Sequence, residues 1–252
     1  MNWATKRKII YAVSFFIFLT AVFVYEARNI LFPSPTCFDQ KQNGFETGID
    51  CGGVCSLRCT NQINKISVTW ARAIKTGAST YDLVAMFTNK NLNSSPNKSD
   101  YLFTIYNKKG NMLDQIKGNT VVPVNSDFPV IIQNVPLKDF PYQVVATASS
   151  GNFYLTNELP SDPTIKVLGT NFEKGDISRL YANIQNTKLV VLNNVPFRAV
   201  LFDENRNTIA VGETIIDRLD KEEQKQIVFT WHNSFPPPTF IRVYPIMDPF
   251  SN

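Results

Sequence analysis

Phe103-Thr-Ile-Tyr-Asn-Lys-Lys-Gly-Asn-Met-Leu113 and Ala199-Val-Leu-Phe-Asp-Glu-Asn-Arg-Asn-Thr-Ile209 are the two stretches that decide the fold. In each, a run of alternating apolar residues leads into an Asn/Gly or Asp/Asn turn and then into a second run. This order is typical of a β-hairpin. The two stretches align at an offset of 96 residues (199 − 103). The chain is therefore predicted to contain the same β unit twice.

Neighbouring segments extend this repeat. At the same offset Val130–Ile132 aligns with Gln226–Val228, and Phe87–Asn89 aligns with Ile184–Asn186 after a slip of one residue. A repeat of this length fits a tandem of β-sandwiches, which are about 100 residues each. We expect the first sandwich at 63–157 and the second at 164–252, with a polar, proline-containing linker at 158–163.

Both units consist of short runs with period two that are rich in aromatic and β-branched residues. Such runs predict half-buried strands. They are centred on Ile66–Trp70, Tyr81–Phe87, Tyr101–Ile105, Val130–Ile132 and Tyr142–Ala146 in the first half, and on Ile165–Val167, Leu180–Ile184, Leu189–Leu192, Phe197–Leu201, Ile209–Val211, Ile227–Trp231 and Phe240–Tyr244 in the second. Residues 91–100 are polar and are predicted to form a long loop.

Two short matches suggest a family for these units. Phe103-x-Ile105-Tyr106-Asn107 and Ala199-x-Leu201-Phe202-Asp203 resemble the F-x-L-Y-D signature of a family of extracellular Ig-like β-sandwiches in bacteria. The first copy departs from the signature at Ile and Asn, and the second at Ala and Phe. The resemblance implies an Ig-like fold and a location outside the cell, and it implies no catalytic residues.

The N-terminus carries a different signal. Ile9–Tyr25 contains 17 residues without a charge, and the apolar segment can continue to Leu31 if the intervening charges lie at the headgroups. We predict that residues 9–31 cross the lipid bilayer. The basic tail, residues 1–8, precedes this segment, so the positive-inside rule places it in the cytoplasm and residues 32–252 outside the cell. A cleaved signal peptide is the alternative, but Val24–Ala27 is a poor cleavage site.

All four cysteines lie just beyond this segment, in residues 32–62. They are Cys37, Cys51, Cys55 and Cys59. An even number of cysteines beside an anchor predicts two disulfides in an oxidising compartment, and three pairings are open. Two alternatives are a zinc–thiolate site and a redox role. The C-x₃-C-x₃-C spacing differs from the usual zinc pairs, and the absence of C-x-x-C disfavours redox chemistry.

The cysteine-rich segment also carries oxygen-bearing side chains between glycines. Asp39, Asn43, Glu46 and Asp50 are candidate calcium ligands, because Ca²⁺ prefers oxygen atoms supplied by a flexible loop. The alternative is that these side chains bond to the backbone in successive tight turns. No other cofactor is expected.

The same segment resembles a known module. Residues 37–55 are similar to the C-x-D-G-x-x-N-x-x-E-x-G-x-D-C-G-G-x-C pattern of bacterial surface and secreted proteins. Gln40 stands where the pattern has its first glycine. The resemblance implies disulfides and a surface location, and it implies no activity.

Composition limits the chemistry. The net charge of +4 is too small and too dispersed to indicate nucleic-acid binding. The only histidine, His232, is expected in a loop at a strand end. The acidic residues Asp203, Glu204, Asp217, Asp220, Glu222 and Glu223 are expected in solvated turns.

These observations predict a mainly β protein with a single N-terminal transmembrane helix, a short disulfide-rich segment and two tandem Ig-like β-sandwiches. The predicted function is non-enzymatic: a single-pass bacterial cell-membrane protein that presents its sandwiches for protein binding, adhesion or envelope assembly. The protein partner is unknown. The alternative is a cysteine-centred metal-binding or redox protein of the cell surface.

Overall fold

The structure is a computed structural model that describes residues 3–31, 36–156 and 164–250. It contains two compact units, Met1–Cys55 and Ser56–Asn252. Strands account for most of the described residues that follow the N-terminal helix, which confirms the predicted mainly β class. The predicted linker at 158–163 lies outside the described residues, and the domain boundaries stay predictions.

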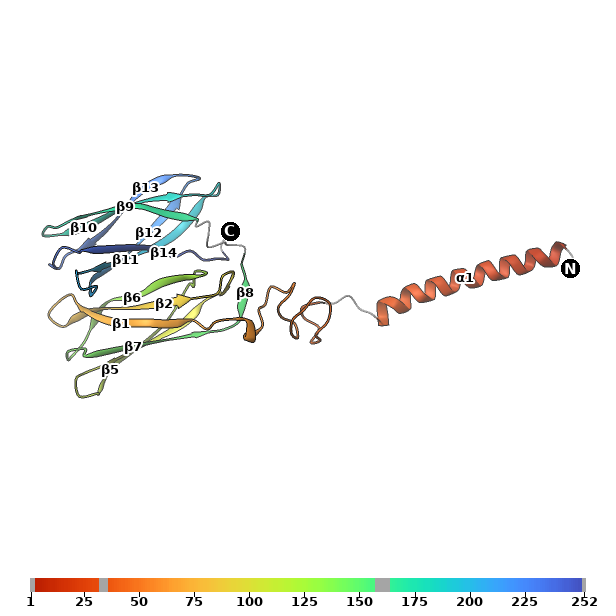
Figure 1. The fold of residues 1–252 in the computed structure, drawn as a ribbon, viewed down its shortest axis with the longest axis horizontal. Coiled ribbons are helices and arrows are strands. Elements are labelled where there is room, and N and C mark those ends of the chain that lie inside the picture. Colours follow the sequence, from red (N-terminus) through yellow and green to blue (C-terminus); the bar gives the residue numbers. More distant parts are fainter. Residues whose placement is uncertain (1–2, 32–35, 157–163, 251–252) are drawn as a thin grey trace. The chain divides into compact units, whose positions relative to one another are not determined.

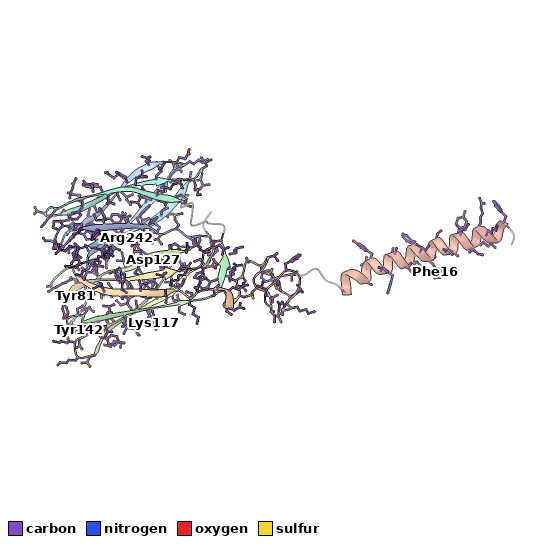
Figure 2. All side chains as sticks on the ribbon, in the orientation of Figure 1. Phe16, Tyr81, Lys117, Asp127, Tyr142 and Arg242 are labelled. Atoms are coloured by element: carbon purple, nitrogen blue, oxygen red, sulfur yellow. A yellow bond between two sulfur atoms is a disulfide. The ribbon has the colours of Figure 1, made fainter. Side chains whose placement is uncertain are left out.

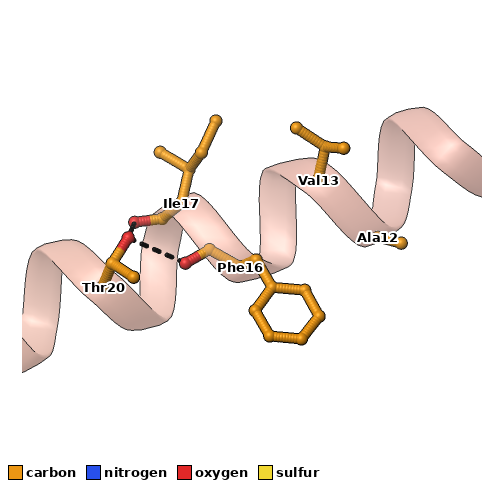
Figure 3. Close-up of a pocket in the computed structure, with 5 residues that line it drawn as sticks. All are labelled: Ala12, Val13, Phe16, Ile17 and Thr20. Carbon is orange, nitrogen blue, oxygen red and sulfur yellow. Dashed lines mark hydrogen bonds between the residues drawn. The ribbon is translucent and has the colours of Figure 1, made fainter.

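The first unit begins with helix α1 (Trp3–Leu31), shown in red in Figure 1. Within it, Lys6–Ala27 is long and apolar enough to cross a membrane, and none of this stretch is buried. Thr20 is one of its few polar residues. Figure 3 shows its hydroxyl donating to the carbonyl oxygens of Phe16 and Ile17, both at 2.9 Å. This hydroxyl is therefore satisfied within the helix, as an apolar environment requires.

The first sandwich belongs to the second unit and consists of two three-stranded antiparallel sheets. One sheet has the order β1 (Ser67–Lys75), β2 (Thr80–Asn89), β6 (Ser126–Pro136), and the other has the order β5 (Met112–Thr120), β4 (Ser99–Tyr106), β7 (Gln143–Ser150). Their inner faces share one apolar core that includes Leu83, Phe87, Phe103 and Ile105, each of which is 0% exposed. A two-stranded ribbon, β3 (Ser94–Pro96) and β8 (Phe153–Leu155), lies beside them.

The second sandwich repeats this arrangement. Its sheets have the orders β13 (Gln224–Trp231), β10 (Ser178–Asn186), β9 (Ile165–Glu173) and β12 (Thr208–Leu219), β11 (Leu192–Phe202), β14 (Phe240–Pro245). The core combines Leu180 and Ile184 of one sheet with Phe197 and Leu201 of the other. Each strand of the two three-stranded sheets thus has a counterpart at the same place in the other sandwich, which confirms that the unit occurs twice; the β3–β8 ribbon has no counterpart among the described residues.

The hairpin turns that revealed the repeat also match in their hydrogen bonds. The amide of Asn107 donates to the carbonyl of Asn111, and 96 residues later the amide of Asp203 donates to the carbonyl of Asn207, both at 2.9 Å. Gly110 has a φ of 80°, and its counterpart Arg206 has a φ of 62°. The left-handed conformation at this position is what the Asn/Gly and Asp/Asn turns supply.

A buried asparagine closes the end of β2 and of β10. Asn89 is 1% exposed, and its amide nitrogen donates to the carbonyls of Ser94 and Pro123, at 3.2 and 3.0 Å. Asn186 is 0% exposed and donates to the carbonyls of Val190 and Asp220, at 2.7 and 2.9 Å. The two asparagines therefore hold equivalent loops onto equivalent strands.

The two sandwiches pack against each other inside the second unit. Ile74 and Val84 of the first meet Val200 and Val211 of the second in a separate apolar cluster. Strand β2 is consequently buried on both faces, whereas its sequence was expected to be half-buried. The uninterrupted apolar run Leu83–Phe87 is the signal for such double burial. Figure 1 shows the sheet of β1, β2 and β6 facing β11, β12 and β14.

Polar and aromatic contacts reinforce this interface. Arg198 on β11 pairs with Glu213 at 2.9 Å and donates from Nη1 to the carbonyl of Pro129, on β6, at 2.8 Å. The Trp70 and Phe202 rings meet edge to face, with centroids 6.5 Å apart. Arg242 of β14 and Asp127 of β6, labelled in Figure 2, are carried by the two facing sheets.

Two local predictions were wrong. Residues 91–100 contain β3 and the start of β4, because Ser95 is buried and its hydroxyl donates to the carbonyl of Val122 at 2.6 Å. The predicted strand at Leu189–Leu192 is a bend up to Val190, and only Leu192 belongs to a strand. Leu189 is 69% exposed, because the bonds from Asn186 turn this segment outward.

Candidate functional site

The cysteine-rich segment is held by disulfides, as predicted. Cys37 and Cys55 are bonded, with Cα atoms 5.7 Å apart. Cys51 and Cys59 are disulfide-bonded as well, so the four cysteines form two disulfides and none is free. Their sulfur atoms therefore carry no thiolate charge, whereas a zinc site or a reactive cysteine requires a thiolate.

The structure brings the four candidate calcium ligands together through backbone turns. Asp50 accepts hydrogen bonds from the amides of Asp39, at 2.9 Å, and Gln40, at 2.9 and 3.1 Å. Asp39 accepts from the Asn43 side chain at 2.8 Å. Glu46 accepts from the Asn43 amide at 3.4 Å. These contacts support the turn-capping interpretation of the side chains. Calcium binding by them stays a prediction.

Hydrogen bonding also sets the charge of Asp39. The bond from the Asn43 side chain, together with the Lys41 backbone amide, lowers the pKa of Asp39 below its ordinary value. This carboxylate is therefore ionised at neutral pH. Gln40, next to it, has a φ of 60°, the left-handed region that favours the glycine of the resembling pattern.

A close approach of two backbone segments fixes the shape of this loop. Gly53 has a φ of 58°, and a Cβ atom on it would lie 1.7 Å from the carbonyl oxygen of Phe45. Only glycine fits there, so the chain at Phe45 rests directly on the chain at Gly53. The segment is thus compact without an apolar core of its own.

One cluster has the residue types of a metal site. Cys37, Glu46 and Cys55 bring their ligand atoms within 4.8 Å of one another. Both sulfurs belong to the same disulfide, however, so the cluster offers a single carboxylate as a charged ligand. The disulfide explains the proximity of the three groups without a metal ion.

Most of the other residues considered for chemistry lie where the sequence placed them, but Asp217 was predicted in a turn and instead lies exposed within β12. His232 is exposed directly after β13. Asp203 accepts from the Asn207 amide at 2.7 Å, and Asp220 pairs with Arg218 at 2.7 Å. Glu223 accepts from the Asp220 amide at 2.6 Å. These acidic groups stabilise hairpin turns.

Sequence reasoning missed Asp82, which lies inside the second unit and is 4% exposed. Burial raises the pKa of its carboxyl group, and the hydrogen bond from the Asn134 amide, 2.9 Å long, opposes that change. The sequence signal for this buried group was a single acidic residue within the apolar run of β2. Its role is structural, because it binds the backbone of β6 at Asn134, whose φ is 58°, where the pairing of β2 with β6 shifts register.

Sequence reasoning also missed two shallow hollows on the outer sheet faces. The first lies on the β5–β4–β7 face and is lined by residues that include Asp100, Leu102 and Lys117. Gly118 helps to form it, since a Cβ there would lie 2.3 Å from the Tyr101 hydroxyl. The second lies on the β9–β10–β13 face and is lined by Leu168, Gly169, Asn183, Gln224, Lys225 and Gln226. Figure 2 labels Lys117 on the first of these faces.

Comparisons with known proteins give no family. No family model and no curated protein sequence matches the chain. Among solved structures, a red sea bream transglutaminase is similar over 76% of this chain and 29% of its own length, at 11% identity and a TM-score of 0.21. The chain therefore spans less than a third of that protein, and a likeness of this size supports no inference about fold or activity.

Proposed function

We propose that this chain is a single-pass cell-surface protein that holds two packed β-sandwiches outside the membrane and binds a protein partner through them, without catalysing a reaction. The observation that carries the proposal is the apolar helix Lys6–Ala27, whose side chains are all unburied. Such a helix is unstable in water, and a bilayer covers it. Bacterial origin and an Ig-like ancestry belong to the same proposal.

Charge around the helix supports its orientation. Lys6, Arg7 and Lys8 lie at its N-terminal end, whereas Glu26 offsets Arg28 at the other. The positive-inside rule then puts the N-terminus in the cytoplasm. A secretory signal sequence has similar composition, and in that case the mature protein would be released.

The disulfides support an external location for the remainder. Cytosolic thiols are kept reduced, so two disulfides with no free cysteine suit an oxidising compartment. The disulfides also disfavour the alternative function, a cysteine-centred metal or redox site, because that function needs free thiolates.

The packing of the sandwiches supports a binding role. An apolar cluster and the bond from the partly buried Arg198 to the Pro129 carbonyl join them, so the pair presents fixed outer faces rather than two independently moving domains. The hollows on the β5–β4–β7 and β9–β10–β13 faces are the surfaces we propose for the partner.

Labelling of intact cells with a membrane-impermeant maleimide tests the topology. Ser234→Cys places a thiol at an exposed position of the second sandwich, and Asn2→Cys places one in the basic tail. We expect Ser234→Cys to react in intact cells, Asn2→Cys to react only after lysis, and the parent chain not to react. Labelling of Ser234→Cys only after lysis would contradict the proposal. Strong labelling of the parent chain would support the cysteine-centred alternative.

Photo-cross-linking tests the binding surfaces. A photoreactive residue at Lys117 or Gln226 reports on the two hollows, and one at Asn205, in the β11–β12 turn, is the control. We expect a discrete cross-linked protein from at least one hollow and none from the control. Equal yields from all three positions would refute a specific partner at these faces.

A further inference from the structure

The disulfide-rich segment has an inverted distribution of polar and apolar side chains. Its oxygen-bearing residues Asp39, Asn43, Glu46 and Asp50 are all partly buried. Its large apolar residues are the exposed ones: Phe38 is 87% exposed, Phe45 82%, Ile49 63% and Val54 69%. In a domain that folds in water, the apolar side chains would be the buried set.

The hydrogen bonds explain how this inversion is stable. The carboxylates of Asp50, Asp39 and Glu46 point inward and accept from backbone amides or from the Asn43 side chain. The Cys37–Cys55 disulfide occupies the centre in place of an apolar core, with Cys55 only 1% exposed. Because disulfides and turns hold the segment, its apolar side chains are free to face outward.

Two of the exposed side chains are brought near each other by the backbone. Phe45 rests on Gly53 through its carbonyl oxygen, and Val54 is the next residue. The chain near Phe45 and the chain near Val54 therefore lie side by side. They form part of an apolar surface on a segment whose carboxylates already accept hydrogen bonds from within it.

The distance along the chain indicates what covers this surface. Helix α1 has 29 residues and at about 1.5 Å per residue is roughly 43 Å long, which matches a bilayer with its headgroups. Leu31 ends the helix, and Cys37 follows six residues later. Six extended residues span at most about 20 Å, so the segment stays beside the bilayer surface.

We infer that Phe38, Phe45, Ile49 and Val54 insert into the interface of the bilayer that holds α1, so that the disulfide-rich segment forms a collar at the base of the ectodomain. This inference rests on the proposed membrane anchor. Aromatic and aliphatic side chains are favourable at the boundary between headgroups and acyl chains. Internal bonding of the carboxylates lowers the cost of bringing this acidic segment to lipid.

Fluorescence quenching in vesicles tests the inference. The full chain with Trp3→Phe is reconstituted in phosphatidylcholine vesicles whose acyl chains carry bromine, and single tryptophans are added by Phe45→Trp or Ile49→Trp. Phe16→Trp, at the centre of α1, reports insertion of the anchor (Figure 2). Phe140→Trp, at a position 63% exposed on the first sandwich, is the matched control. The parent with Trp70 and Trp231 alone gives the background.

We expect the tryptophans of Phe45→Trp and Ile49→Trp to emit at shorter wavelength than a tryptophan exposed to water. Bromines attached to the acyl chains near the headgroups should quench both of them and should not quench Phe140→Trp. Quenching at Phe16→Trp with water-like emission at both segment positions would overturn the collar and leave the anchor intact. Absence of quenching at Phe16→Trp would overturn the anchor itself. Equal quenching at Phe140→Trp would also overturn the collar. A thiol assay on each variant confirms that both disulfides have formed.

Discussion

Removal of the buried asparagine of the second sandwich should destabilise it more than its size suggests. In Asn186→Ala, two hydrogen bonds from Nδ2 and one to Oδ1, from the Lys188 amide at 3.0 Å, are lost. At about 1 kcal/mol for each bond, the free energy of unfolding should fall by about 3 kcal/mol. We expect a loss close to this figure, because Asn186 is 0% exposed and water does not readily replace its bonds, while the Asp220 carbonyl keeps a bond from the Glu223 amide at 3.2 Å.

Guanidinium unfolding of the full chain in detergent measures this change. Trp231 lies in the core of the second sandwich and reports its unfolding directly. Asn183→Ala is the matched control, since Asn183 lies on the same strand but is exposed, and it accepts one bond from Gln226 at 3.2 Å. The control should change the free energy by less than about 0.5 kcal/mol. If Asn186→Ala shifts the midpoint no more than Asn183→Ala, the assigned role of the buried amide is wrong.

Three further predictions concern stability. Asp82→Asn should stabilise the fold at neutral pH, because burial raises the pKa of Asp82 in the folded chain above the ordinary value of 3.8. The parent therefore loses stability as pH rises from the ordinary pKa to the raised pKa, and the unfolding curves of the two chains should converge below the ordinary pKa. A gap between the curves that persists at low pH would count against this reasoning. Gly212→Ala should cost about 1–3 kcal/mol, because its Cβ would lie 2.9 Å from the Trp231 ring, whereas Gly169→Ala, which meets open space, should be nearly neutral in the same denaturant assay. Finally, the melting midpoint should be the same in calcium and in chelator, because the candidate carboxylates already accept backbone amides; a midpoint raised by calcium would establish the cation site instead.

The repeated fold was predictable because its signals are local. Alternating residues and the turn chemistry at Asn107 and Asp203 specify hairpins without reference to the rest of the chain. The alignment also placed Asn89 over Asn186. Their role as loop clamps was not predicted, because it depends on carbonyl groups 34 residues away in each case.

Packing between the sandwiches was beyond the sequence analysis. A period of two predicts one buried face for a strand, and only the second sandwich buries the other face of β2. The shortest bond of Arg198 across the interface goes to the backbone carbonyl of Pro129, and any residue type could supply that group. The uninterrupted apolar run Leu83–Phe87 indicates that both faces of β2 are buried, but neither contact leaves a pattern that identifies the partner surface.

The candidate site was predicted in its residues and not in its geometry. Four cysteines allow three pairings, so the Cys37–Cys55 bond could not be chosen from spacing. Oxygen side chains between glycines suit both a cation and a set of turns, and the sequence does not show which atoms accept the bonds. The outward position of Phe38 and Phe45 was likewise hidden, because the disulfide takes the place that an apolar core would fill.

Intact-mass analysis of membranes washed at alkaline pH tests the central claim most directly. If α1 stays in the lipid, the membrane pellet should retain a chain of 28.5 kDa that still includes residues 9–31, with two disulfides. Recovery of the protein in the soluble fraction, either as the full chain or as a shorter chain that has lost these residues, would contradict a permanent membrane anchor.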